Sequence, residues 1–167
     1  MASRSPQCDP QRQRVYDMEN HGMAILRHSV LSKKDVARVV RQLSTIYNVK
    51  PPRIKYVPLH GWAGEYESGE IRLATDHKTG RSPLTVIHEF AHYLVHIRDP
   101  ENLLESHGPE FVAMLGHCYE SAGAVPRDGF DVLCKDWKVK ALPIKKKATP
   151  AQLKATVART VKARSAK

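Results

Sequence analysis

Residues 84–95 of the chain read Leu-Thr-Val-Ile-His-Glu-Phe-Ala-His-Tyr-Leu-Val. Their apolar side chains recur at helical spacing, which predicts a helix over residues 84–97 that ends before Pro100. His88 and His92 are four residues apart, so on this helix they lie about 6 Å apart along the axis and point in nearly the same direction. Two imidazoles placed in this way can bind one zinc ion.

Glu89 completes a His-Glu-x-x-His motif. Because it lies beside the first histidine, its carboxylate can reach a water molecule at the metal without binding the metal, and it can then accept a proton from that water. The motif therefore predicts Glu89 as the general base of a hydrolytic zinc site. The competing interpretation is a helix that carries two hydrogen-bonded histidines and an exposed glutamate. It is disfavoured because burying such groups near one face without a metal is costly.

A catalytic zinc ion usually takes a third protein ligand and keeps one position open. His96 continues the series, but on a straight helix it lies about 12 Å along the axis from His88. Three acidic residues are also candidates: Glu105, Glu110 and Glu120. The remaining candidate is His107, which stands directly before a Gly-Pro pair that can begin a helix. We favour His107, because a helix start would hold it in place and Gly108 would allow its close approach to the first helix.

The segments around the motif predict an α+β body. The expected elements are a helix from Asp9-Pro10 to about Glu19, a helix over 33–47, strands over 53–57, 62–67 and 70–74, the helix over 84–97, and a helix over 109–122. Asp9 and Ser32 are the expected caps of the first two helices, and Ser68-Gly69 is the expected turn between the last two strands. We expect Trp62 and Tyr66 to pack in the core, and Cys118 and Cys134 to be small buried residues.

The positive charge of the chain is concentrated at its C-terminal end. The chain has 167 residues and a formal net charge of +10, and residues 135–167 hold 11 of its 27 lysines and arginines but only one of its 17 acidic residues. Residues 1–134 are therefore neutral overall and form the expected folded domain. A solubilising appendage and a nucleic-acid-binding arm both fit residues 135–167, which can include a short amphipathic helix; a membrane-surface role is weaker because no aromatic anchor is present. The residues expected to contact DNA or RNA are Lys145, Lys146, Lys147, Lys154, Arg159, Lys162 and Arg164.

Cysteine usage and hydropathy exclude several protein classes. The three cysteines are odd in number and form no Cys-x-x-Cys pair, which argues against a disulfide scaffold or a zinc ribbon and fits a reducing compartment. No apolar run approaches the roughly 20 residues of a membrane span, and residues 1–14 lack the apolar segment of a secretory signal. We therefore expect a cytoplasmic protein without a membrane partner.

Two motifs together carry a resemblance to a known family. The HEFAH sequence at 88–92, followed by HGPEF at 107–111, resembles the SprT-like zinc metalloproteases, which include the Spartan proteases. The resemblance implies a zincin-like metallopeptidase domain over 1–134, with His88, His92 and His107 as zinc ligands and Glu89 as the base. Residues 11–16, Gln-Arg-Gln-Arg-Val-Tyr, together with the motif are also similar to a family of uncharacterised HExxH metallohydrolases of actinobacteria and their phages.

The architecture of the SprT-like proteases implies a use for the strands. An edge strand beside the zinc helix can pair with an extended peptide and align its carbonyl with the metal, and Gly69 to Ala74 is the expected edge. A donor to the developing oxyanion is also needed. The side chains considered for it are Tyr93, Tyr119 and His117, although each is more typical of a core or surface residue.

These observations favour a zinc-dependent metallopeptidase that acts on a protein or peptide substrate, with the basic tail holding it near nucleic acid. One alternative is a non-enzymatic nucleic-acid-binding protein in which zinc only braces the fold. Another is a metallohydrolase that acts on amides outside proteins, because HExxH by itself does not define the acyl substrate.

Overall fold

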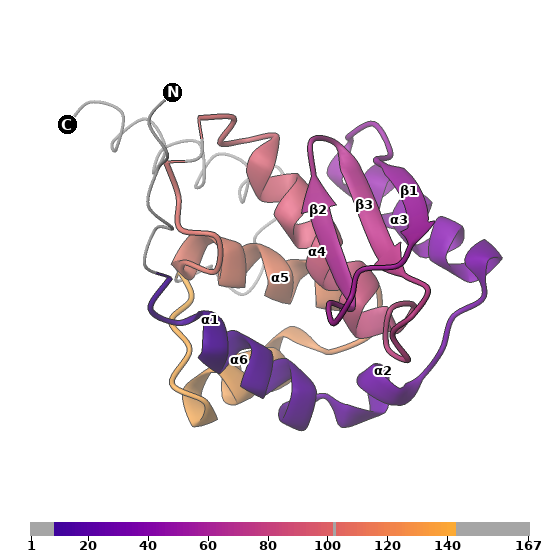
Figure 1. Cartoon of the computed structure of the whole chain (residues 1–167). Helices are drawn as coiled ribbons and strands as arrows, with labels where there is room; N and C mark the ends of the chain where they lie inside the picture. The colour runs from indigo at the N-terminus through magenta and orange to yellow at the C-terminus, as the bar shows by residue number, and fades with distance from the viewer. Residues whose placement is uncertain (1–8, 102, 143–167) are drawn as a thin grey trace.

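The computed structural model describes residues 9–101 and 103–142. Over these residues the chain forms an α+β fold with six α-helices, one π-helical segment and a three-stranded sheet (Figure 1). The helices are α1 (Arg12–Asp17), η1 (Met18–Gly22, the π-helix), α2 (Ala24–His28), α3 (Lys33–Tyr47), α4 (Pro83–His96), α5 (Pro109–Ser121) and α6 (Arg127–Asp136). The strands are β1 (Arg53–Val57), β2 (Gly64–Glu67) and β3 (Glu70–Ala74). The α+β class predicted from the sequence is confirmed.

The sheet has the strand order β1-β3-β2. β2 and β3 form an antiparallel hairpin, and both turn residues, Ser68 and Gly69, have the positive φ that such a two-residue turn requires. β1 pairs in parallel with β3, which makes β3 the central strand. The prediction of residues 69–74 as the free edge is therefore wrong. The hairpin itself does not determine on which side β1 adds, and its addition to β3 leaves β2 at the edge.

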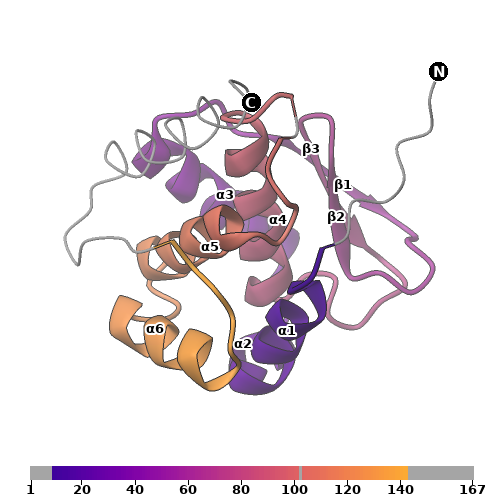
Figure 2. The same cartoon turned by 90° about the vertical axis from the view of Figure 1, so that its left-hand side faces the viewer.

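α4 lies between the sheet and α5 (Figure 2). Ser82 caps its first turn by accepting a hydrogen bond from the N–H of Thr85, and Pro83 occupies a first-turn position where no N–H is needed. Eleven of its fourteen residues are buried, because it packs against β2 and β3 on one side and α5 on the other. This packing buries His88 and leaves His92 half-buried.

The described chain continues beyond α6 and lies against the domain as far as Leu142. Val139 is buried, and the N–H of Leu142 donates to the carbonyl of Pro109. Gln11 accepts a hydrogen bond from the N–H of Lys140, and its amide nitrogen donates to the carbonyls of His107 and Lys140. Residues 135–142, which the sequence analysis placed in the tail, thus help to join the N-terminal segment to the segment that carries His107.

Several local predictions are confirmed and others are wrong. α3, β1 and β3 have the predicted bounds, and Cys118 and Cys134 are buried free thiols. Asp9 is not a helix cap: Gln11 precedes α1, and the Asp9 carboxylate accepts a hydrogen bond from His107 instead. Trp62 is not a core residue, because 53% of it is exposed. The sequence analysis missed α2, which is only five residues long, and α6, which contains a glycine.

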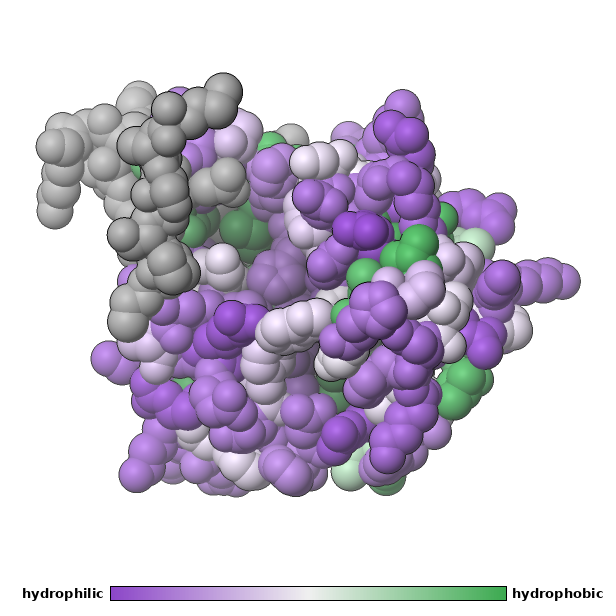
Figure 3. Space-filling view, viewed as in Figure 1, coloured by the Kyte–Doolittle hydropathy of each residue, from purple (hydrophilic) through white to green (hydrophobic). Residues whose placement is uncertain are grey.

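The surface is mostly hydrophilic on the face shown in Figure 3, where the hydrophobic patches are separate from one another. Large apolar side chains that are exposed in the described chain include Ile25, Val30 and Trp62. The described residues contain no helix that is both long enough and apolar enough to span a membrane.

Candidate metal centre

Three histidines converge at the centre of the domain. His88 and His92 lie on α4, and His107 lies directly before Gly108, the N-cap residue of α5. The Nε2 atom of His88 lies 3.1 Å from Nε2 of His92 and 3.3 Å from Nε2 of His107, and one nitrogen from each ring lies within 4.8 Å of the others. Ligand atoms 2.0–2.1 Å from a tetrahedral zinc ion would be about 3.3 Å apart. The three imidazoles therefore fit a metal ion.

Two of these imidazoles donate a hydrogen bond from their other ring nitrogen to a carboxylate. Nδ1 of His88 donates to Oε2 of Glu19 over 2.8 Å, and Nδ1 of His107 donates to Oδ2 of Asp9 over 2.6 Å. A hydrogen on Nδ1 leaves the lone pair of a neutral imidazole on Nε2, the atom that faces the cluster. Carboxylates in this position are typical of metal-binding histidines, because they fix the tautomer and the ring orientation.

Glu19, which binds His88, lies on the π-helical segment η1. This segment widens the turn between α1 and α2, and such segments are frequent at functional sites. The Glu19 side chain is only 1% exposed, and its second oxygen accepts a hydrogen bond from the Tyr119 hydroxyl over 2.7 Å. Both carboxylate oxygens therefore have partners, which is what a buried charge requires. α5 contributes the tyrosine, so the site joins three separate helical segments.

The surroundings lower the pKa of two of the histidines and raise that of the third. Burial, together with the charge of His88, lowers the pKa of His92 well below its usual range. Burial and His88 also lower the pKa of His107 to about 4, although Asp9 opposes the change. At His88, burial alone would lower the pKa, but the Glu19 carboxylate outweighs it and raises the pKa. A metal ion at the cluster would thus meet two neutral imidazoles and displace a proton from the third.

Glu89 is buried beside the cluster, between α4 and the edge strand β2. Burial raises the pKa of Glu89 to about 7, while the nearby His88 and the backbone N–H of Tyr66 lower it. Gly64 on β2 makes this close packing possible: a Cβ there would lie 2.7 Å from Cγ2 of Thr85 and 3.0 Å from Cγ of Glu89. The carboxylate is therefore held in a fixed place with a pKa close to neutral pH.

A cleft of about 200 Å³ opens onto His88 and Glu89. Tyr16 lines this cleft, and its ring stacks on that of His88 at a centroid distance of 5.6 Å and meets that of His107 edge-on at 5.1 Å. Burial raises the pKa of Tyr16, so its hydroxyl stays protonated and can donate a hydrogen bond. The guanidinium of Arg12 lies 5.5 Å from this ring and 5.3 Å from the ring of Trp62.

The structure places the other candidates elsewhere. In the described part of the chain, His88, His92 and His107 form the cluster that could hold a metal ion, and neither His96 nor the acidic candidates Glu105, Glu110 and Glu120 belong to it. Tyr119 donates its hydroxyl to Glu19, and Tyr93 donates its hydroxyl to the carbonyl of Lys50. The seven basic residues expected to contact nucleic acid lie outside the described residues, so that expectation stays a prediction.

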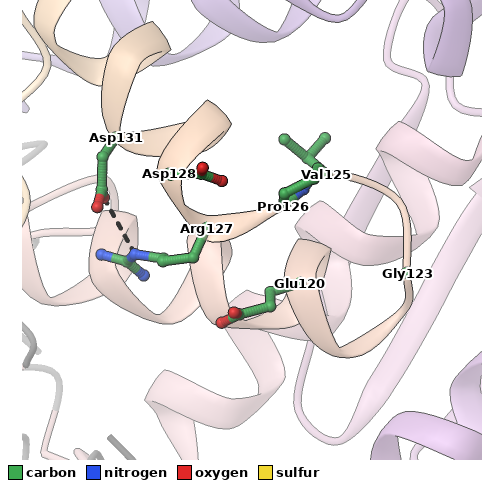
Figure 4. Close-up of a pocket in the computed structure, with 7 residues that line it drawn as sticks. All are labelled: Glu120, Gly123, Val125, Pro126, Arg127, Asp128 and Asp131. Carbon is green, nitrogen blue, oxygen red and sulfur yellow. Dashed lines mark hydrogen bonds and ion pairs between the residues drawn. The ribbon is translucent and has the colours of Figure 1, made fainter. Parts of the chain in front are cut away.

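A second cavity, of about 500 Å³, lies at the junction of α5 and α6 (Figure 4). His117, the third side chain considered as an oxyanion donor, has its Nδ1 3.8 Å from Oε2 of Glu120, which lines this cavity. Glu120, Asp128 and Asp131 line this cavity with Arg127, whose Nε donates to Asp131 over 3.0 Å. Burial and the charge of Arg127 lower the pKa of His117. This group of residues, His117, Glu120, Arg127 and Asp131, is called the α5–α6 cluster below.

Sequence reasoning missed three residues of the site: Asp9, Glu19 and Tyr16. From the sequence, Asp9 is expected to cap a helix and Glu19 only to end it. Tyr16 ends the 11–16 segment that carries one of the two resemblances, and this was the signal that could have drawn attention to it. Comparisons of the chain with models of protein families, with curated proteins and with solved structures give no match.

Proposed function

We propose that this protein is a zinc-dependent metallopeptidase with a zincin-like site. One observation carries the proposal: two buried imidazoles and one half-buried imidazole direct their Nε2 atoms at one point, and a buried carboxylate with a raised pKa lies on the cleft that leads to it. His88, His92 and His107 would hold the zinc ion. When bound, zinc would supply a Lewis acid that polarises the scissile carbonyl and lowers the pKa of the attacking water.

Glu89 supplies the proton transfers. Its carboxylate accepts a proton from the attacking water and then donates it to the nitrogen of the leaving amine, so that one residue acts as base and then as acid. A pKa near 7 suits both steps at neutral pH. Tyr16 lies against two of the histidine rings and donates a hydrogen bond to the oxyanion that develops on the carbonyl.

β2 is the strand that could align a peptide in the cleft. The N–H of Ala74 donates to the carbonyl of Ala63, and hydrogen-bonded pairs alternate along an antiparallel ladder. Gly64 and Tyr66 therefore direct their backbone groups away from β3, toward the free edge next to α4. An extended substrate that adds to this edge would run past Glu89.

The test uses full-length protein purified without added metal or a metal-binding tag. Elemental analysis should find close to one zinc per chain, and a mixture of quenched fluorescent peptides should be hydrolysed. Glu89→Gln should keep the zinc and abolish hydrolysis, whereas Glu67→Gln, an exposed change on β2, should keep both. Absence of zinc uptake by the folded chain, or full turnover by Glu89→Gln, would contradict the proposal.

A further inference from the structure

In the part of the chain that the structure describes, the cleft beside Glu89 contains an arginine without an acidic partner. Arg27, at the end of α2, lines the same cleft as His88 and Glu89, and its Nε is buried without a hydrogen-bond partner. Within residues 9–101 and 103–142, no carboxylate forms an ion pair with it. A partly buried guanidinium that faces no anion is costly, because it has lost water without gaining a charged partner.

The carboxylates nearby are already engaged. Glu19 also lines the cleft, but its two oxygens accept hydrogen bonds from His88 and Tyr119. Glu89 is required for proton transfer under the proposed function. An anion that pairs with Arg27 would therefore come from a molecule that enters the cleft.

A second guanidinium adds positive charge at the opening. Arg12 lies over the rings of Tyr16 and Trp62, two residues that line the cleft, and among the described residues it too has no carboxylate partner. Arg27 in the cleft and Arg12 over two of its lining rings favour an anionic group there, and the planar guanidinium of Arg27 matches the two oxygens of a carboxylate.

We propose that Arg27 recognises a carboxylate on the substrate, close to the amide that is hydrolysed. This inference rests on the proposed function and names its substrate class. The cleft, at about 200 Å³, is smaller than the 300–1,000 Å³ of ordinary ligand pockets, so it suits a short part of a substrate rather than a long segment. A free C-terminal carboxylate and an acidic side chain beside the scissile bond both supply this chemistry.

Two small hydroxamates test the inference on the zinc-loaded, full-length protein. Acetohydroxamate and succinic monohydroxamate share the same zinc-binding group, and only the second carries a carboxylate. Isothermal titration calorimetry should show that the carboxylate probe binds about 10- to 100-fold more tightly, the gain typical of a hydrogen bond between charged groups. Arg27→Gln should remove this preference, and Arg41→Gln, an exposed change on α3, should keep it.

The outcomes separate the two proposals. If neither hydroxamate binds, the loaded zinc offers no open position to a ligand and the proposed function is overturned. If acetohydroxamate binds but the carboxylate adds nothing, or if the preference survives in Arg27→Gln, the carboxylate inference is overturned while the zinc site stands. Tighter binding of phosphonoacetohydroxamate than of succinic monohydroxamate would overturn it in favour of a phosphate.

Two longer probes identify the source of the carboxylate. Succinic monohydroxamate coupled to glutamic acid α-amide carries only a side-chain carboxylate, and the same hydroxamate coupled to glutamine carries only a C-terminal carboxylate. Whichever binds more tightly than the matched glutamine amide supports the inference and names the source. Equal affinity of all three probes would contradict it.

Discussion

The metal centre and the α5–α6 cluster contain similar types of residue in different arrangements. Each combines histidine with carboxylates, and each has an arginine over an aromatic ring: Arg12 over Tyr16 at 5.5 Å in one, and Arg127 over Phe130 at 5.8 Å in the other. In the metal centre the carboxylates bind the Nδ1 atoms of the imidazoles. In the α5–α6 cluster Asp131 binds the arginine, and Nδ1 of His117 lies 3.8 Å from Glu120.

The difference shows that residue types alone do not make a metal site. In the metal centre, three Nε2 atoms point at one another, and carboxylates accept hydrogen bonds from Nδ1 of His88 and of His107. In the described part of the chain, His117 belongs to no such histidine cluster, and Asp131 binds Arg127 rather than an imidazole. Changes in the α5–α6 cluster therefore serve as the internal control for changes in the metal centre.

The largest effect is expected from removal of a ligand. His107→Ala should reduce zinc affinity far more than the 10- to 100-fold typical of losing a hydrogen-bond partner of a ligand, because one of three bonds to the metal disappears. His117→Ala should leave zinc affinity unchanged. Competition with a calibrated chelator measures both, and an equal loss in the two variants would erase the distinction between the clusters.

The next effect is expected from removal of the Tyr16 hydroxyl. Phe130, the ring under Arg127 in the other region, has no such group. Tyr16→Phe should lower kcat by about 100- to 1,000-fold, the cost of removing one donor to an oxyanion, while zinc affinity stays the same. Steady-state kinetics on a cleaved peptide, with zinc content measured in parallel, gives both values. Unchanged kcat would mean that the Tyr16 ring only packs against the histidines, as Phe130 packs in its own cluster.

A smaller effect is expected from weakening the support of a ligand. Asp9→Asn should reduce zinc affinity by about 10- to 100-fold, because His107 loses the charged acceptor that orients its ring. Asp131→Asn is the matched change in the α5–α6 cluster and should not alter zinc affinity. Chelator competition on both variants decides whether Asp9 acts on the metal centre or only on the fold.

The smallest effect compares two tightly packed glycines. A Cβ on Gly64 would lie 2.7 Å from Thr85, and one on Gly116 would lie 2.6 Å from Phe130. Each change to alanine should lower the free energy of unfolding by about 1–3 kcal/mol through overpacking. Urea denaturation measures this loss, but only Gly64→Ala should also lower kcat, because its Cβ lies against Glu89. An equal fall in kcat for both would show that activity follows global stability.

The sequence by itself determined the elements whose signals are local. Ser32 and the apolar spacing of residues 33–47 define α3, and alternation with a Ser-Gly turn defines the hairpin of β2 and β3. The HExxH spacing places His88 and His92 on the same side of α4, because side chains four residues apart share one face of a helix. The helix and its capping residue also depend only on neighbours within a few positions. These features could be read from the chain before any packing was known.

Only the tertiary structure decided the strand order and the carboxylates behind the histidines. Glu19 lies 69 residues from His88, and Asp9 lies 98 residues from His107, so no local pattern relates them. β1 could pair with either strand of the hairpin, and its pairing with β3 is what leaves β2 free beside Glu89. Long-range contacts of this kind depend on how buried surfaces and charges are satisfied together, and the sequence determines them only through the whole fold.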